Sequence, residues 1–198
     1  MDKKLSELIC TRISHDLIGN IGAVANAAEL LEEENDIAEV KEVLPILKIG
    51  SGVLVARLRF FRMLFGLHSP NIEDMAVVKQ TTAAYLATTG GKQPPALNFA
   101  LETPRYAVAA MAAVMALADL MRGGSINVVE QGGKVSVSVS GDVKLGDSKV
   151  EQFVSVLKST AVEISAQDVP LLYLLDACRN CGIKLSFGSN PMLRLVLE

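Results

Sequence analysis

The chain has 198 residues, of which 50% are hydrophobic and 21% are charged, and its formal net charge is −3. This composition predicts a globular protein and excludes a disordered chain, and the absence of a basic excess argues against nucleic acid as a partner. No run approaches the roughly 18 apolar residues that span a bilayer, and Ser6, Glu7 and Arg12 interrupt any signal-peptide core. We therefore expect a cytoplasmic protein that does not bind membranes.

The first part of the chain predicts two long helices. Residues 3–34 contain no proline and carry apolar side chains at helical spacing, and a second helix is expected over residues 37–67. The short connection between them predicts an antiparallel hairpin. Apolar residues cover more than one stripe of each helix, so a lone hairpin would leave apolar surface in water. We expect two copies to associate into a four-helix bundle, which makes the protein a homodimer.

From residue 71 onward the pattern alternates between helix and strand. The Gly-rich turn at residues 131–133 joins two segments of period two, which predicts a β-hairpin. The sequence therefore predicts an α+β protein with a helical hairpin over residues 1–70 and an α/β sandwich over residues 71–198. The expected helices of the second part are 73–88, 105–121, 148–158 and 168–181, and its expected strands are 97–102, 125–130, 134–140, 183–187 and 192–197.

The stripe of the first helix that contains His15 also contains Gly19 and Gly22, because a helix advances by about 100° per residue. Each glycine inside a helix costs roughly 0.5–1 kcal/mol relative to alanine, so two of them require a reason. They could permit close helix packing, and residues 50–52 (Gly-Ser-Gly) are expected to lie opposite Gly19. They could also clear space around the imidazole for a macromolecular partner.

A histidine in this setting suits phosphoryl relay, because neutral imidazole is nucleophilic near pH 7. Asp16 could orient the ring, and Arg12, one turn earlier, could meet the incoming phosphoryl oxygens. The alternative is a partly buried structural histidine. Ser14, His15 and Asp16 cannot form a hydrolytic triad, since adjacent helical side chains point about 100° apart.

The remaining candidates for chemistry are few. His68 is expected to cap the second helix, where the helix dipole favours a cationic ring. Cys178 and Cys181 form a lone C-x-x-C near the end of an apolar helix, without a second pair to complete a zinc site. We interpret these cysteines as structural and expect no metal.

Two motifs carry a resemblance to a known family. Residues 15–23 read H-D-L-I-G-N-I-G-A, residues 28–32 read A-E-L-L-E, and residues 60–66 read F-F-R-M-L-F-G. Together they resemble the phospho-accepting helix and the second-helix ending of ChpT-type bacterial histidine phosphotransferases. One departure is Asn20, where that family often has proline.

The resemblance implies a dimeric bundle like that of histidine kinases, followed by a domain that resembles their ATPase domain. It implies that phosphoryl passes from the receiver aspartate of a hybrid histidine kinase to response-regulator receivers. His15 would be the carrier and Asp16 its neighbour. No cofactor is expected in this chain, because Mg²⁺ would be supplied by the receiver. The residues expected to contact receivers are Arg12, Gly19, Gly22, Arg57, Arg59 and Arg62.

Two other functions remain open from the sequence. An ATP-dependent histidine kinase would need an Asn-bearing helix and loops such as D-x-G-x-G, whereas residues 105–122 contain no Asn and no such loop follows. A non-catalytic dimer could instead dock on a kinase or receiver and regulate it. Such a docking protein would have no need for a nucleophile surrounded by glycines.

Overall fold

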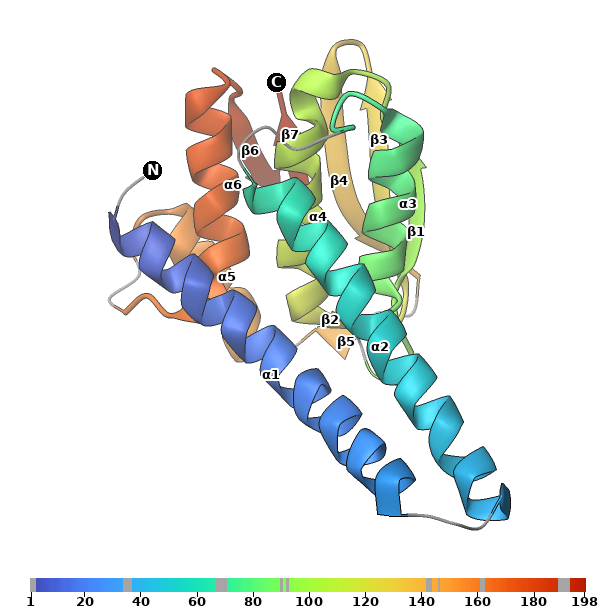
Figure 1. Ribbon diagram of the computed structural model, residues 1–198. Helices are drawn as coiled ribbons and strands as arrows, with labels where there is room; N and C mark the ends of the chain where they lie inside the picture. The colour runs from blue at the N-terminus through green and yellow to red at the C-terminus, as the bar shows by residue number, and fades with distance from the viewer. Residues whose placement is uncertain are drawn as a thin grey trace.

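A computed structural model describes residues 3–33, 37–66, 71–89, 91, 93–141, 144–145, 147–160, 163–188 and 193–198. The predicted cap at His68 lies outside these residues. Figure 1 shows a long helical hairpin whose near ends pack on an α/β domain. The helices are α1 (Lys3–Glu33), α2 (Ile37–Phe65), α3 (Met75–Leu86), α4 (Ala107–Leu120), α5 (Asp147–Leu157) and α6 (Val169–Asn180). Short 3-10 turns, η1 (Pro104–Tyr106) and η2 (Ala166–Asp168), precede α4 and α6.

The C-terminal domain is built on a five-stranded mixed sheet with strand order β1-β3-β4-β7-β6. β1 runs parallel to β3, and the other neighbours are antiparallel. Alternation along β4 buries Val135, Val137 and Val139 against the helical layer and leaves serines on the other side. The five strands are β1 (Ala96–Ala100), β3 (Ser125–Gln131), β4 (Lys134–Ser140), β6 (Leu185–Gly188) and β7 (Arg194–Leu197).

The predicted α+β class is confirmed, and each expected helix and strand has a counterpart. A small antiparallel ribbon, in which β2 (Met121–Arg122) pairs with β5 (Lys144–Leu145), was not predicted from the sequence. Two residues are too few to show a periodic pattern, so only the tertiary fold reveals this pairing.

Helix α4 lies at the centre of the core. Twelve of its fourteen residues are buried, and only Val108 and Asp119 are partly exposed. Its many alanines allow the sheet and the neighbouring helices to approach its backbone closely. A helix that is apolar on all sides is expected in such a central position.

The apolar core continues from α4 into the near ends of the hairpin. Phe60 and Leu64 of α2 belong to the same buried cluster as α4, and Tyr85 of α3 stacks on Phe60 at 3.9 Å between ring centroids. On the other side, Ile9 of α1 packs with Val169 at the start of α6. The predicted boundary near residue 70 stays a prediction, and the structure joins both predicted domains through this shared core.

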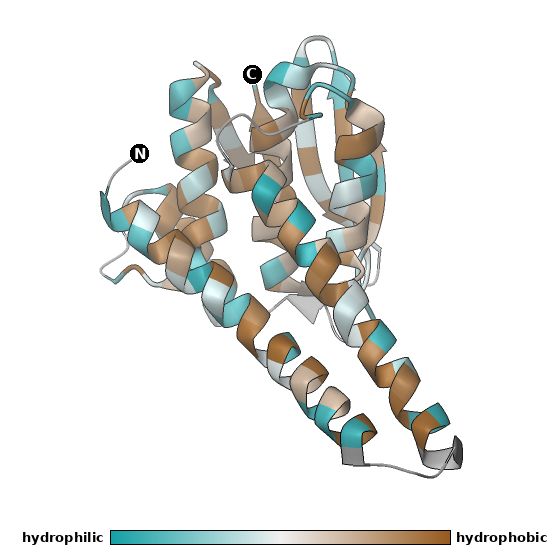
Figure 2. Ribbon diagram, viewed as in Figure 1, coloured by the Kyte–Doolittle hydropathy of each residue, from teal (hydrophilic) through white to brown (hydrophobic). Residues whose placement is uncertain are grey.

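The far half of the hairpin projects away from the domain (Figure 1). Hydrophobic residues are visible on its outer sides as well as between its helices (Figure 2). In the described part of the chain, no helix combines the length and apolar character needed to cross a bilayer. The large apolar side chains exposed on the two helices are Ile18, Ile21, Leu30, Leu44, Ile46, Ile49, Val55 and Leu58.

The glycines of the hairpin differ in their surroundings. A Cβ added to Gly50 would lie 2.8 Å from Cγ2 of Val24, whereas a Cβ on Gly19 or Gly52 would meet nothing within 4 Å. The expected pairing of residues 50–52 with Gly19 is therefore wrong. Gly50 lies against Val24 because the hairpin pairs more than a turn further from the domain than the sequence suggested.

We predict that Gly50→Ala is less stable than Gly52→Ala by about 1–3 kcal/mol, because overpacking costs about that much. Val24 has little freedom to move aside, since a β-branched side chain keeps one rotamer in a helix. Both variants gain the same helix propensity, so Gly52→Ala is the matched control. Urea unfolding of the two variants measures the difference, and equal midpoints would contradict the assigned contact.

Candidate functional site

His15 lies on an exposed face of α1, where the hairpin meets the domain. Its side chain is 82% exposed, and Gly19 and Gly22 follow it along open helix surface. This exposure excludes the alternative of a buried structural histidine. Within the chain, Gly19 and Gly22 do not serve close packing, so they leave the surface around the imidazole unobstructed.

Asp16 is the neighbour that faces both His15 and the rest of the site. Its Oδ1 lies 3.4 Å from Nδ1 of His15, and its Oδ2 accepts a hydrogen bond from Nε of Arg12 at 2.7 Å. The side chain of Asp16 is only 13% exposed, so its carboxylate is held in place while the imidazole remains in solvent. The orienting role of Asp16 stays a prediction, and this arrangement places its carboxylate where that role requires it.

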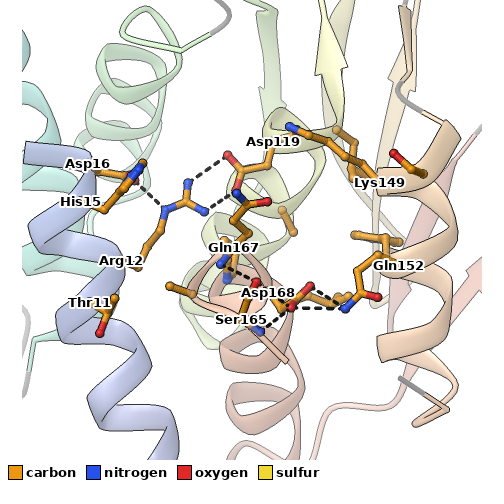
Figure 3. Close-up of a pocket in the computed structure, with 17 residues that line it drawn as sticks. Thr11, Arg12, His15, Asp16, Asp119, Lys149, Gln152, Ser165, Gln167 and Asp168 are labelled. Atoms are coloured by element: carbon orange, nitrogen blue, oxygen red, sulfur yellow. Dashed lines mark hydrogen bonds and ion pairs between the residues drawn. The ribbon is translucent and has the colours of Figure 1, made fainter. Parts of the chain in front are cut away.

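Arg12 links α1 to the C-terminal domain through a bidentate ion pair. Its Nη1 and Nη2 donate to Oδ2 and Oδ1 of Asp119 at 2.8 and 3.0 Å (Figure 3). Burial by itself lowers the pKa of Arg12, but the carboxylates of Asp119 and Asp16 outweigh burial and raise it above its ordinary value. Arg12 is thus a buried, permanently charged link between two carboxylates.

Asp119 lies in the last turn of α4. Burial raises the pKa of its carboxyl above the ordinary value, and the bound Arg12 guanidinium opposes that rise. Sequence reasoning missed Asp119, although it is the single charged residue of an otherwise apolar helix. That isolation is the signal that could have drawn attention to it.

The other predicted arginines divide into two groups. Arg57 donates to the carbonyl oxygens of Asp16 and Thr88 and to the Thr88 hydroxyl, so it ties α2 to α1 and to the end of α3. Arg59 and Arg62 lie further along α2 with exposed side chains. The structure therefore brings Arg12, Asp16 and Arg57 together around the base of His15, and it leaves Arg59 and Arg62 on the surface.

A cavity of about 620 Å³ opens beside His15, between α1, α4, α5 and the η2–α6 junction. The Lys149 ammonium, at the start of α5, donates to the backbone carbonyl of Asp119 at 3.1 Å. Elsewhere in the cavity lining, Gln152 and Ser165 hydrogen-bond to Asp168 in a capping arrangement (Figure 3). Sequence reasoning singled out none of these four polar residues on α5 and around η2.

Comparison of folds places the chain with a bacterial phosphotransferase of known structure. A solved protein described as "1.7 Angstrom Structure of a Bacterial Phosphotransferase" matches it with a TM-score of 0.79 over 100% of this chain and 98% of the other, at 22% sequence identity. The TM-score establishes a common fold, and at this sequence identity the likeness shows the fold alone. The α1–α2 hairpin followed by a mixed-sheet domain is therefore the architecture of that phosphotransferase.

The sequence itself matches a particular phosphotransferase. The curated protein phosphotransferase ChpT of Brucella abortus (strain 2308) is 39% identical over 62 residues, which are 31% of this chain and 28% of that relative. The match thus spans less than a third of the relative's length, and no family model matches the chain. The resemblance to ChpT-type phosphotransferases that the two motifs predicted is confirmed.

The cysteines lie apart from this site. Cys178 is buried, and Cys10 and Cys181 are exposed. Burial, with a smaller contribution from Cys181, raises the pKa of the Cys178 thiol to about 11. Among the described residues, no three His, Cys, Asp or Glu side chains are arranged to hold a metal ion. Burial of Cys178 fits the structural interpretation of that residue, whereas Cys181 is exposed.

We predict that Cys178 reacts with iodoacetamide far more slowly than Cys10 and Cys181 at pH 8, because the thiolate is the reactive form. A pKa of about 11 leaves Cys178 almost entirely protonated at that pH. Mass spectrometry of peptides after timed alkylation measures the three rates. Equal labelling of the native protein would contradict the assignment, and equal labelling in urea is the control.

Proposed function

We propose that this chain is a histidine phosphotransferase that accepts a phosphoryl group on His15 from one receiver domain and delivers it to another. The observation that carries the proposal is the exposed imidazole of His15 above the held carboxylate of Asp16. The open surface at Gly19 and Gly22 supports access by a protein as large as a receiver. The likeness to phosphotransferases in fold and in part of the sequence supports the same reaction class.

The proposed chemistry depends on which imidazole nitrogen of His15 faces the solvent. Nδ1 faces Asp16, so Nε2 is the nitrogen presented to a partner. Its lone pair attacks the phosphorus of an aspartyl phosphate, and the bond from phosphorus to the aspartate oxygen breaks, with the electron pair leaving on the carboxylate. Asp16 stabilises the positive charge that develops on the imidazole. The reverse sequence passes the phosphoryl group to the aspartate of the next receiver.

Charge neutralisation in this transfer would be shared across the interface. In the proposed relay the Mg²⁺ ion belongs to the receiver, and this chain needs no cofactor of its own. Arg59 and Arg62 have exposed side chains that can contact an acidic receiver face. Arg12 and Arg57 are engaged inside the protein, so we assign them to positioning rather than to contact with phosphoryl oxygens.

The charges of the cavity beside His15 favour a protein donor over ATP. Two cationic side chains line it, Arg12 and Lys149, against three carboxylates, Asp16, Asp119 and Asp168. Arg12 is already shared between two of those carboxylates. A lining with an excess of negative charge repels a triphosphate, which ATP-binding sites attract with cations and backbone amides. We therefore propose that a hybrid-kinase receiver supplies the phosphoryl group and that response regulators receive it.

The exposed apolar residues of the hairpin support a homodimer. Side chains such as Ile18, Ile49 and Leu58 are each more than half exposed on the projecting helices. Apolar surface spread over two neighbouring helices is typical of an interface and costly to leave in water. We propose that two hairpins pack along these faces into a four-helix bundle that displays two copies of His15.

We predict that His15→Ala abolishes transfer of radiolabelled phosphoryl from a pre-phosphorylated receiver to the protein and onward to a second receiver. The side chain is exposed, so the variant should keep its fold and its assembly state. Timed transfer reactions with wild type, the variant and ATP alone test this. Label on wild type from ATP alone would support a kinase instead. Phosphoryl transfer by the His15→Ala variant would show that another residue is the carrier. If the wild type accepted no label from any receiver, a non-catalytic docking protein would be favoured.

We predict that Ile49→Glu converts a dimer to a monomer. Burying one isoleucine is worth about 1.5–3 kcal/mol, and two-fold symmetry counts the change twice, so association should weaken by roughly 100-fold or more. Size-exclusion chromatography with light scattering measures the mass. Val129→Glu, which alters an exposed apolar residue of β3, should leave the mass unchanged. A dimeric Ile49→Glu protein would place the interface elsewhere.

A further inference from the structure

A continuous chain of four side chains runs from the C-terminal domain to the His15 ring. Asp119 of α4 holds both Nη atoms of Arg12, the Nε of Arg12 holds Oδ2 of Asp16, and Oδ1 of Asp16 faces Nδ1 of His15. Figure 3 shows the Arg12 side chain extending from α1 to Asp119, with Asp16 and His15 beside α1. The only fully charged link between α4 and the His15 turn, among the described residues, is this one.

The location of Asp119 is unfavourable for a residue that only stabilises its own helix. It occupies the last turn of α4, where the helix dipole disfavours negative charge by about 0.3–1 kcal/mol. It also lies in a helix whose other side chains are all apolar, and burial opposes its ionised form. A buried ion pair is weak evidence for stability, because desolvation offsets much of its attraction. A role in orienting Arg12 explains better why a carboxylate occupies this unfavourable position.

The geometry that Asp119 provides is the direction of the Arg12 guanidinium. A planar fork held at both Nη atoms has one orientation, and in that orientation its remaining Nε–H points at Oδ2 of Asp16. Without Asp119, the two Nη groups would be free to bind Asp16 bidentately. Both oxygens of Asp16 would then be drawn to Arg12, and Oδ1 would turn away from Nδ1 of His15.

We propose that Asp119 is a positioning residue for phosphoryl transfer: acting through Arg12 and Asp16, it holds the His15 imidazole so that Nε2 faces the incoming phosphoryl group. This inference rests on the proposed function. It assigns the C-terminal domain a direct part in the reaction, because the domain supplies the residue that orients the nucleophile. Asp119 itself contacts neither His15 nor the partner.

The test compares Asp119→Asn, which keeps the shape but loses the charge, with Asp119→Glu, which keeps the charge. At saturating phosphorylated receiver, Asp119→Asn should lower the maximal transfer rate by roughly 10- to 100-fold, since small misplacement of a nucleophile has effects of that size. The receiver concentration for half-maximal rate should change less than about threefold, because Asp119 is not at the docking surface. Asp119→Glu should recover part of the rate.

A second readout does not depend on transfer. Long-range ¹H–¹⁵N correlation spectra of ¹⁵N-histidine-labelled protein report which nitrogen of His15 carries the proton. Asp119→Asn should change that pattern, and Asp74→Ala should not, although it removes the carboxylate that caps α3 and so controls for lost stability. In the transfer assay, a protein that carries both Arg12→Gln and Asp119→Asn should be no slower than one that carries Arg12→Gln alone. This is expected because both residues act on His15 through the same chain of contacts.

The two readouts separate this inference from the proposed function. Failure of the wild type to accept phosphoryl from any receiver would refute the proposed function, and the His15 spectra would still test the geometry. A wild-type transfer rate in Asp119→Asn, or an unchanged His15 spectrum, would overturn the positioning role. A slower rate that Asp74→Ala reproduces would likewise overturn it, since loss of stability would then be the cause.

Discussion

The burial of α4 on every side is the constraint on which the rest of the structure depends. A helix that is apolar around its whole circumference must be enclosed, and the sheet with α3 and α6 encloses only part of it. The end of α2 completes the enclosure through Phe60 and Leu64. The hairpin is therefore docked on the domain by the same apolar burial that forms the core, and α1 is brought past the C-terminal end of α4.

This docking explains how an exposed histidine can have a defined geometry. The His15 ring itself is exposed and makes few contacts within the chain. The neighbouring residue Asp16 is instead held by two arginines. Arg57 donates a hydrogen bond to its backbone carbonyl, and Arg12 donates one to its carboxylate. Both arginines are in turn anchored outside α1, at Thr88 and Asp119. The orientation of the site is thus set by the domain, while its access is set by the glycines of α1.

The two halves of the hairpin have different surroundings for a physical reason. The near half buries its apolar residues on α4 and α6, whereas the far half extends beyond the domain and keeps apolar side chains in solvent. Gly50 allows the far helices to approach at Val24, but two helices cannot cover apolar surface that faces outward. The proposed dimer would cover that surface and display His15 on a four-helix bundle.

The sequence by itself determined the class of fold and the order of the elements, and it singled out His15 as the candidate site. Hydrophobic periodicity is local information, so α1, α2, α4 and the β3–β4 hairpin could be predicted from it, and the motif around His15 is contiguous. The hairpin register at Gly50, the β2–β5 ribbon and the anchoring of Arg12 by Asp119 could not. Each of these depends on which residues meet across 22 to 107 positions of chain, and only the tertiary structure decides that. Arg12 showed this most directly, because its charge was readable from the sequence but its partner was decided by the tertiary structure.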